Sequence, residues 1–254
     1  MGRVICVGSA KGGVGKTTLT ANLSLALTEM GYSVIVIDAN LTTSNLSIHF
    51  GIPTYPTGVQ DIMKGKAKID DVIYEHPTGL KIIPADISLD KIMVPKTRQF
   101  VNIFYSLIDN ADFILIDSAA GLGRESLSAV EAADELLIVT NPELPAITDA
   151  LKLARMAEKC GTANLGVVVN RIKGKKHEIP IEGISEFIDL PVIGIVPEDE
   201  TVRKAISFRQ PIILFNRGSP AAQQFIGIAS NLLGEDYSPS FSIRGFFSDI
   251  LNRF

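Results

Sequence analysis

The chain alternates between short, continuously apolar runs and longer segments in which apolar residues recur every three or four positions. Continuous runs are typical of strands buried in a parallel sheet, and the helical spacing is typical of helices that cover it. The runs fall at residues 4–7, 33–38, 80–84, 112–117, 135–140, 165–170 and 192–196. The helical segments fall at residues 19–27, 46–50, 96–109, 124–133, 144–159, 182–188, 198–205 and 218–233. This order predicts an α/β fold of three layers, with helices on both faces of a mostly parallel, twisted sheet.

The same pattern divides the chain into three parts. Residues 1–233 are predicted to form one α/β domain, within which the proline- and glycine-containing segment 52–79 is expected to hold short helices and turns. Residues 234–241 form a polar linker by this interpretation. Residues 242–254 are predicted to form a separate amphipathic helix.

Composition narrows the class of protein. A net charge of −4 argues against a protein that coats DNA generally, although it leaves room for a local basic patch. The two cysteines, Cys6 and Cys160, are far apart in sequence, which favours a reducing cytosol over a disulfide framework. No apolar run approaches the ~18–20 residues needed to span a bilayer.

The strongest chemical signal follows the first strand, where residues 10–18 read AKGGVGKTT. Glycines let a strand-to-helix turn curl so that backbone N–H groups and the helix N-terminus converge on an anion. A lysine then reaches the outer phosphates and a threonine hydroxyl reaches Mg²⁺. The predicted phosphate-binding residues are Gly12, Gly13, Val14, Gly15, Lys16, Thr17 and Thr18.

Two more strands end in a carboxylate on the same predicted edge of the sheet. Asp38 follows the second strand, and Asp117 follows the apolar run 113–116. Because ligands bind at the carboxyl ends of parallel strands, both side chains are expected near the phosphate loop. Together with Thr17, Asp38 and Asp117 are the predicted Mg²⁺ ligands, directly or through bound water.

The run KGGVGKTT resembles the deviant Walker A box of the MinD/ParA family of P-loop ATPases, which also contains the nitrogenase iron protein. Ala10 stands where the plain pattern has glycine, and Lys11 is the additional lysine that marks this family. The resemblance implies ATP or ADP and Mg²⁺ as cofactors and a homodimer around two ATP molecules. It also implies that Lys11 reaches across that dimer to the partner's ATP, and that the protein hydrolyses ATP.

The family's two nucleotide-sensing loops match residues 38–46 and 117–123. Where the first usually carries a second aspartate that positions the attacking water, this chain has Asn40. Asparagine orients water through its amide oxygen but is a poor base, so we expect slow hydrolysis. The alternative is that Asn40 merely forms a turn. In the second loop, Gly121 is the residue expected to approach the γ-phosphate.

Three further segments match the family at strand ends. Asn170 and the adjacent Arg171 resemble its adenine-recognition position, although an asparagine there is also an ordinary cap. The segment Pro197, Glu198 and Asp199 resembles the one that contacts the base, with a helix N-cap as the alternative for Asp199. Glu143 either meets the partner's Lys11 or favours the dipole of the following helix.

The tail presents one apolar helical face beyond the linker, with Arg244, Ser248 and Asp249 on the other side. Such a helix suits the membrane interface, and docking on its own domain or on a partner protein is the alternative. The expected membrane-contacting residues are Ile243, Phe246, Phe247, Ile250, Leu251 and Phe254.

Within the family, a short amphipathic tail resembles the ATPases that select the division site. We therefore expect a cytoplasmic ATPase that binds the inner face of the membrane reversibly in its ATP state and serves an unidentified division or regulatory protein. A ParA-like DNA-partitioning ATPase and a slowly hydrolysing membrane scaffold, including the flagellar-placement type, are the alternatives. The charge and the apolar tail make a nucleic-acid partner the less favoured one.

Overall fold

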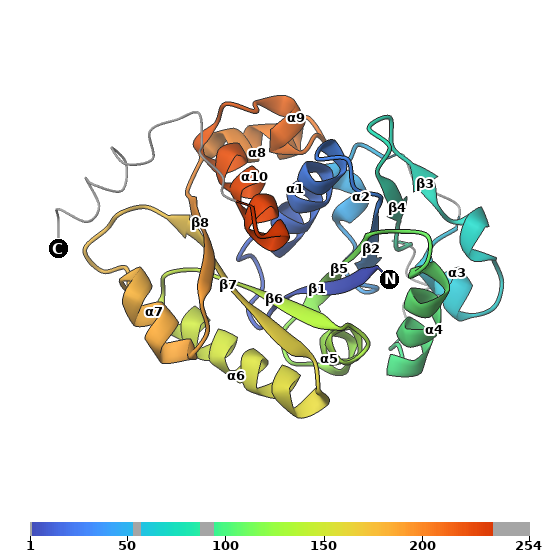
Figure 1. Ribbon diagram of the computed structural model, residues 1–254, viewed down its shortest axis with the longest axis horizontal. Coiled ribbons are helices and arrows are strands. Elements are labelled where there is room, and N and C mark those ends of the chain that lie inside the picture. Colours follow the sequence, from blue (N-terminus) through green and yellow to red (C-terminus); the bar gives the residue numbers. More distant parts are fainter. Residues whose placement is uncertain (1, 53–56, 87–93, 236–254) are drawn as a thin grey trace.

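The computed structural model describes residues 2–52, 57–86 and 94–235. Over these ranges the chain forms one sheet with helices on both faces (Figure 1). The predicted tail helix and its six apolar positions lie outside the described residues. No helix within the described ranges combines the length and apolar character needed to cross a bilayer.

The sheet has eight strands in the order β3-β4-β2-β5-β1-β6-β7-β8, and every pairing is parallel except that of β3 with β4. The central strand β1 pairs with β5 on one side and β6 on the other. The strands are β1 Arg3–Ser9, β2 Val34–Ala39, β3 Tyr74–Glu75, β4 Lys81–Ile83, β5 Phe113–Ala120, β6 Glu135–Thr140, β7 Ala163–Ile172 and β8 Val192–Pro197. The predicted α/β fold with a mostly parallel sheet is confirmed.

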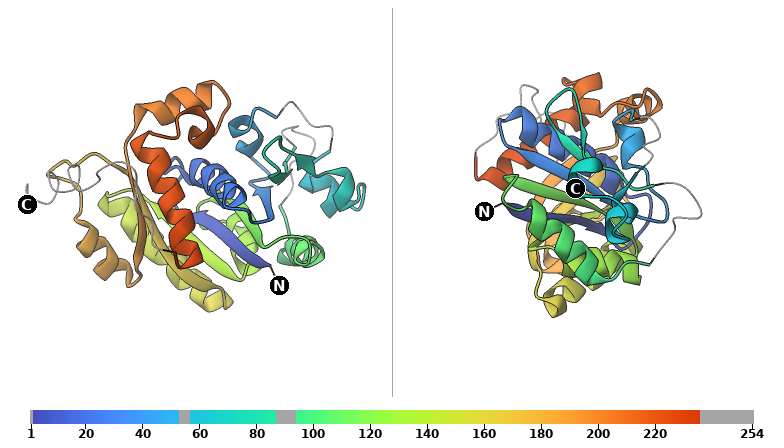
Figure 2. Two further views of the ribbon diagram at one scale, coloured as in Figure 1. Left: turned by 45° about the horizontal axis from the view of Figure 1, so that its top comes forward. Right: turned by 90° about the vertical axis from the view of Figure 1, so that its right-hand side faces the viewer.

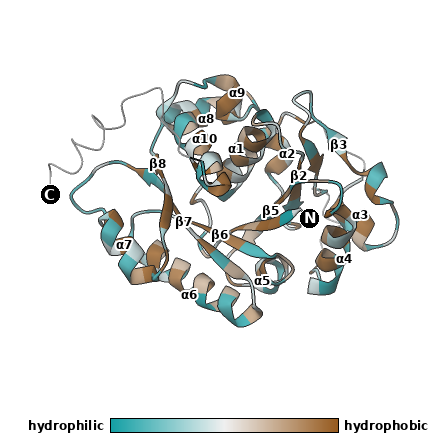
Figure 3. Cartoon of the chain, viewed as in Figure 1, coloured by the Kyte–Doolittle hydropathy of each residue, from teal (hydrophilic) through white to brown (hydrophobic). Residues whose placement is uncertain are grey.

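Helices cover the sheet in two groups, one on each face (Figures 1 and 2). The first group is α1 Lys16–Glu29, α2 Leu46–His49, α8 Glu200–Ser207, α9 Ile212–Phe215 and α10 Pro220–Leu233. The second is α3 Val59–Met63, α4 Thr97–Leu107, α5 Arg124–Glu131, α6 Leu144–Cys160 and α7 Ile181–Ile188, with the 3-10 turn η1 Ile69–Asp71 beside it. Hydrophobic and hydrophilic residues alternate along α6 and α7, as expected of helices that pack one side against a sheet (Figure 3).

Each face of the sheet has its own hydrophobic core, because successive side chains of a strand point to opposite faces. In β1, Val4 and Cys6 pack with the α4–α7 side, whereas Ile5 and Val7 pack with the α1 and α10 side. All four side chains are buried. This double burial explains why the strands read as continuous apolar runs in the sequence.

Two described elements were not predicted as such, and both are very short. The two-residue strand β3 lies in the segment expected to hold only short helices and turns, and two residues are too few to show a strand period. Helix α9 has four residues after Pro211, and its start is held by Asn22 of α1, whose Oδ1 accepts the Ile213 N–H (3.2 Å). That contact joins residues far apart in sequence, so local pattern carries no sign of it.

Candidate functional site

The glycine-rich loop between β1 and α1 adopts a backbone that its glycines make possible. Gly13 and Gly15 have φ of 77° and 99°, in the left-handed region that favours glycine. A Cβ atom at position 15 would lie 2.1 Å from Nδ2 of Asn170, so a side chain there is excluded. The loop therefore needs glycine at position 15 for both its backbone angle and its contact with β7.

Lys16, the first residue of α1, forms a buried ion pair with Asp117 of β5. Its Nζ lies 3.1 Å from Oδ1 of Asp117, and the two side chains are 7% and 0% exposed. The Thr20 hydroxyl donates to the same oxygen at 3.5 Å. The other oxygen, Oδ2 of Asp117, is buried and has no hydrogen-bond partner among the described residues. A buried carboxylate oxygen without a partner is costly, which marks the place where a further positive charge or donor belongs.

Asp38 lies directly beside Asp117, because the two residues are register partners in β2 and β5. Asp38 is fully buried, and its carboxylate accepts hydrogen bonds from the Ser44 hydroxyl (2.6 Å) and from the N–H groups of Asn40 and Leu46. Burial, and then the charge of Asp117, raise the pKa of Asp38 to about 7, although these donors counteract the shift. The two carboxylates thus repel each other where one lysine is the nearest cation.

These residues fit a bound Mg²⁺ of the kind that phosphate loops use. No group of three histidine, cysteine or acidic side chains within the described ranges forms a metal site by itself. Mg²⁺ in phosphate sites is held instead by one or two protein oxygens, with phosphate and water supplying the rest. The unpartnered oxygen of Asp117, the neighbouring Asp38 and the hydroxyl of Thr17 at the start of α1 are suitable donors.

Asn40 is engaged in a local turn. Its Oδ1 accepts hydrogen bonds from the N–H and the hydroxyl of Thr43 (3.1 and 3.0 Å), and its Nδ2 donates to the Thr43 carbonyl (2.8 Å). Only 8% of the residue is exposed. The amide oxygen, through which Asn40 would orient a water, thus already accepts two hydrogen bonds within the turn, which is the alternative interpretation of this residue.

Lys11 and Glu143 meet at the same edge of the sheet, within one chain. Nζ of Lys11 lies 3.1 Å from Oε2 of Glu143, and both side chains are well exposed. Glu143 immediately precedes α6 and makes no side-chain cap to it. Lys11 and Glu143 thus form an ion pair with each other in this structure. An exposed ion pair of this kind contributes only about 0–1 kcal/mol to stability.

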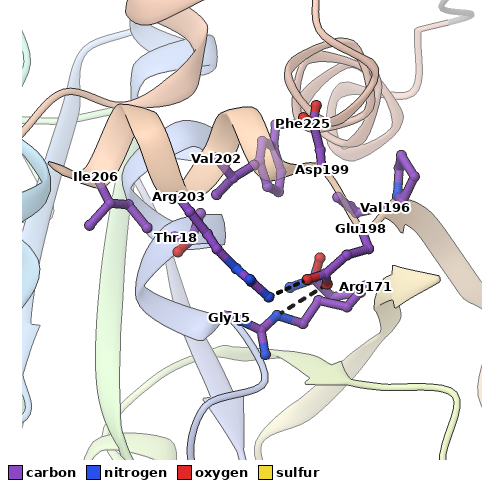
Figure 4. A pocket seen from close by; sticks show the side chains of 12 residues that line it. Gly15, Thr18, Arg171, Val196, Glu198, Asp199, Val202, Arg203, Ile206 and Phe225 are labelled. Carbon is purple, nitrogen blue, oxygen red and sulfur yellow. Dashed lines mark hydrogen bonds and ion pairs between the residues drawn. The ribbon is translucent and has the colours of Figure 1, made fainter. Parts of the chain in front are cut away.

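A pocket opens beside the phosphate loop, at the ends of β7 and β8 (Figure 4). Nδ2 of Asn170 donates to the Val14 carbonyl (2.7 Å), so this amide ties β7 to the phosphate loop. Asp199 accepts the Thr201 N–H (2.8 Å) and caps α8, as the alternative interpretation expects. The lining residues are Gly15, Thr18, Asn170, Arg171, Val196, Pro197, Glu198, Asp199, Val202, Arg203, Ile206 and Phe225.

Glu198 organises two arginines at the mouth of this pocket. Its carboxylate lies 2.7 Å from Nη2 of Arg203 and 3.6 Å from Nε of Arg171, as the dashed lines of Figure 4 show. Arg171 has a φ of 63°, a strained backbone for a non-glycine residue. Arg203 was not predicted, because its contact with Glu198, five residues earlier across the start of α8, follows no sequence motif.

His49 is a second residue that sequence reasoning missed. This buried side chain of α2 has its Nε2 3.3 Å from the Thr18 hydroxyl and its Nδ1 3.0 Å from the Asn45 carbonyl. Burial lowers the pKa of His49, which favours the neutral ring. A single histidine in a short helix gives no sequence signal of such a contact.

The chain is similar to known proteins over most of its length. The family model described as ParA, NUBPL iron-transfer P-loop NTPase, matches residues 1–233. A relative from Methanocaldococcus jannaschii, named only as an uncharacterized ATP-binding protein, is 40% identical over 237 residues, which cover 93% of this chain and 90% of the relative.

Two solved structures share the fold over nearly the whole chain. The septum site-determining protein MinD of Pyrococcus horikoshii, complexed with Mg-ADP, is 36% identical with a TM-score of 0.88, covering 91% of this chain and 96% of that one. A chain of the MinC:MinD cell division protein complex of Aquifex aeolicus is 33% identical with a TM-score of 0.81, covering 94% and 99%.

The raised pKa of Asp38 predicts a pH-dependent stability in protein free of metal and nucleotide. The folded pKa of about 7 exceeds the ordinary 3.8, so the folded state binds this proton more tightly than the unfolded chain. The protonated Asp38 therefore stabilises the folded state fully below about pH 4, and this stabilisation is lost as the pH rises towards 7. We expect Asp38→Asn to raise the melting temperature more at pH 8 than at pH 5, measured by scanning calorimetry in EDTA. An equal difference at both pH values would contradict the assignment.

Proposed function

The chain belongs to the ParA/MinD family of P-loop NTPases, and we propose that it is a Mg²⁺-dependent ATPase that dimerises with ATP and binds a membrane reversibly. The observation that carries ATP hydrolysis is the buried Lys16–Asp117 pair with one unpartnered carboxylate oxygen beside the phosphate loop. The relative from P. horikoshii was solved with Mg-ADP, and its fold covers this site.

Each residue of the loop has a separate task in this proposal. Backbone N–H groups of residues 12–18 and the N-terminus of α1 bind the phosphates. The ammonium group of Lys16, which is paired with Asp117 here, contacts the outer phosphates when the nucleotide binds. Thr17, with Asp117 and Asp38 directly or through water, would hold Mg²⁺. When bound, the ion would supply positive charge beside the phosphate oxygens. Gly121 lies in the loop after β5, and its N–H donates a hydrogen bond to the Ser9 carbonyl beside the phosphate loop (2.9 Å).

The adenine base is assigned to the pocket between Asn170 and the segment Pro197 to Asp199. Its mouth carries Glu198 with Arg171 and Arg203, and its apolar wall includes Val202 and Phe225. Asn170 also holds the phosphate loop through Val14, so the base and phosphate subsites share a residue.

Dimerisation is assigned to the carboxyl edge of the sheet, where Lys11 and Glu143 are exposed. Because their ion pair is worth only about 0–1 kcal/mol, Lys11 can leave Glu143 for the phosphates of the partner's ATP at little cost. Glu143 is then free to face the partner's Lys11, as the family resemblance implies.

Membrane contact is assigned to the tail beyond Gly234, whose sequence has one apolar helical face. Helix α10 ends at the opposite edge of the sheet from the nucleotide site, because the Leu232 carbonyl accepts a hydrogen bond from Nη1 of Arg3 (3.0 Å), the first residue of β1. A dimer that closes at the nucleotide edge would thus leave the ends of both α10 helices uncovered. Two tails bind a surface far more tightly than one. The division-site role and a MinC-like partner rest on the A. aeolicus complex, and the proposed location is the cytoplasmic face of the membrane.

Slow hydrolysis is proposed from the occupied side chain of Asn40, which has neither a negative charge nor a free amide oxygen. We expect Asn40→Asp to raise kcat for ATP by about 10-fold or more, since a positioned carboxylate contributes on the order of 10²–10⁴ as a base. Steady-state phosphate release measures this. Thr43→Val is the control, because it loosens the same turn without adding charge. An unchanged kcat in an Asn40→Asp protein that binds ATP normally would contradict the role.

The membrane step predicts sedimentation with vesicles that depends on both ATP and the tail. The full chain is expected to co-sediment with anionic lipid vesicles in Mg·ATP and to stay in the supernatant in Mg·ADP, while a chain ending at Gly234 stays there in both. Phe247→Glu places a charge on the apolar face and should abolish binding, whereas Ser248→Glu on the polar face should weaken it far less. Absence of sedimentation in every state contradicts the membrane role.

A further inference from the structure

One side of the loop between β2 and α2, residues 40–45 (the β2–α2 loop), is held by the carboxylate of Glu125. Glu125 accepts hydrogen bonds from the N–H of Leu41 (2.5 Å), the N–H of Thr42 (3.1 Å) and the hydroxyl of Thr42 (2.8 Å). Bonds to an ionised carboxylate are stronger than neutral ones, and three of them on one side chain fix its direction. The position of this loop therefore depends on the position of Glu125.

Glu125 itself belongs to the element that follows the other nucleotide-facing loop. It is the second residue of α5, which begins at Arg124 after the β5–α5 loop of residues 121–123. That loop starts at Gly121, whose φ is 97° and whose N–H donates to the Ser9 carbonyl beside the phosphate loop. A displacement of Gly121 is therefore transmitted to Glu125 through the few residues that join them at the N-terminus of α5.

The opposite side of the β2–α2 loop is fixed to a different part of the molecule. Nε2 of Gln60 in α3 approaches the Leu41 carbonyl (3.5 Å) and donates to the Asp86 carbonyl (3.0 Å). The Ser44 hydroxyl lies 2.6 Å from Oδ2 of Asp38 and 3.2 Å from the Ala85 carbonyl. The loop is thus attached on this side to α3, to Asp38 of β2 and to the end of β4, and on the other side to Glu125. Only Glu125 connects it directly to the start of α5, which follows the β5–α5 loop.

We propose that Glu125 is a positioning residue that couples the β5–α5 loop to the β2–α2 loop, so that nucleotide contact at Gly121 sets the place of Asn40. This inference rests on the proposed ATPase function. Leu41 and Thr42 follow Asn40 directly, and a shift of the carboxylate must move their N–H groups or break the bonds. Glu125 acts through other residues and touches neither nucleotide nor metal in this account.

A purely structural role is the alternative, because an acidic residue in the first turn of a helix also favours its dipole. The same helix offers a matched control. Glu131 of α5 accepts a hydrogen bond from the Thr97 hydroxyl (2.7 Å), a contact of the same chemistry away from the nucleotide loops. Removing either glutamate affects stability, but only Glu125 is expected to change the response to nucleotide.

The test is hydrogen exchange of the amides of residues 40–46 in the full chain, measured without nucleotide, with Mg·ADP and with a non-hydrolysable Mg·ATP analogue. In the parent protein we expect the analogue to slow exchange of this loop relative to Mg·ADP. Glu125→Ala should speed exchange at Leu41 and Thr42 by about 10-fold and remove the difference between the nucleotides. Glu131→Ala should leave that difference intact.

Kinetics supply a second readout. Glu125→Ala should lower kcat by about 10-fold with KM within about twofold, because a displaced loop loosens the hydrogen bonds by which it holds Asp38. Thr42→Val should lower kcat less. In the Glu125→Ala background, Thr42→Val should not lower kcat further, because both substitutions remove the same contact. Thr97→Val, alone or with Glu131→Ala, should not alter kcat.

The outcomes separate the coupling from the function on which it rests. A Glu125→Ala protein that keeps both kcat and the nucleotide-dependent exchange of the parent overturns the coupling alone. Equal losses in Glu125→Ala and Glu131→Ala also overturn it, because they indicate a stability effect. A parent that binds neither nucleotide overturns the proposed function together with the coupling.

Discussion

Three buried charges govern this molecule, and two of them have the same sign. Lys16 pairs with Asp117, Asp38 lies beside Asp117 in the neighbouring strand, and one oxygen of Asp117 has no partner within the described part of the chain. Burying a charge costs on the order of several kcal/mol per ion after relaxation, and one lysine does not compensate for two carboxylates. The pKa of Asp38 rises to about 7 as a result. The central parallel strands hold these carboxylates together, and in the proposed function a divalent cation with phosphate relieves their repulsion.

The same edge of the sheet explains the other features of the site. Because β1, β2, β5, β6, β7 and β8 are parallel, their carboxyl ends meet at one edge, and each contributes a polar residue to it. Lys11 with Glu143 is exposed there, Asn170 reaches back to the phosphate loop, and Glu125 holds the β2–α2 loop. The opposite edge carries the end of α10, so the proposed dimer and membrane contacts use different sides of the domain.

Sequence pattern predicted the parts of this structure that local chemistry determines. Strands buried on both faces must be continuously apolar, so each parallel strand was visible, whereas β3 and α9 are too short to show a period. The phosphate loop was recognisable because its glycines, Lys16 and Thr17 must follow one another. Asp38 and Asp117 were recognisable because each ends an apolar run, and the structure makes them neighbours.

Several contacts of the site could not be predicted from the sequence, because no local pattern marks them. The pairing of Lys11 with Glu143 in the same chain and the three bonds from the β2–α2 loop to Glu125 join residues far apart in sequence. The contact of Arg203 with Glu198 is local, five residues apart across the start of α8, but no sequence motif marks it. For Asn40 both interpretations were available, and the structure shows the turn, while its effect on the rate of hydrolysis stays a prediction.

In the proposed function, Asp117 and its neighbours are arranged for a nucleotide that binds together with Mg²⁺. Isothermal titration calorimetry of ADP, with Mg²⁺ and with EDTA, tests it most directly, because ADP binding involves neither hydrolysis nor the tail. We expect Mg²⁺ to raise the affinity of the parent protein for ADP by about 10-fold or more, equivalent to ~1.4 kcal/mol or more. Asp117→Asn should remove most of this gain. The same affinity with and without Mg²⁺ in the parent protein would contradict it.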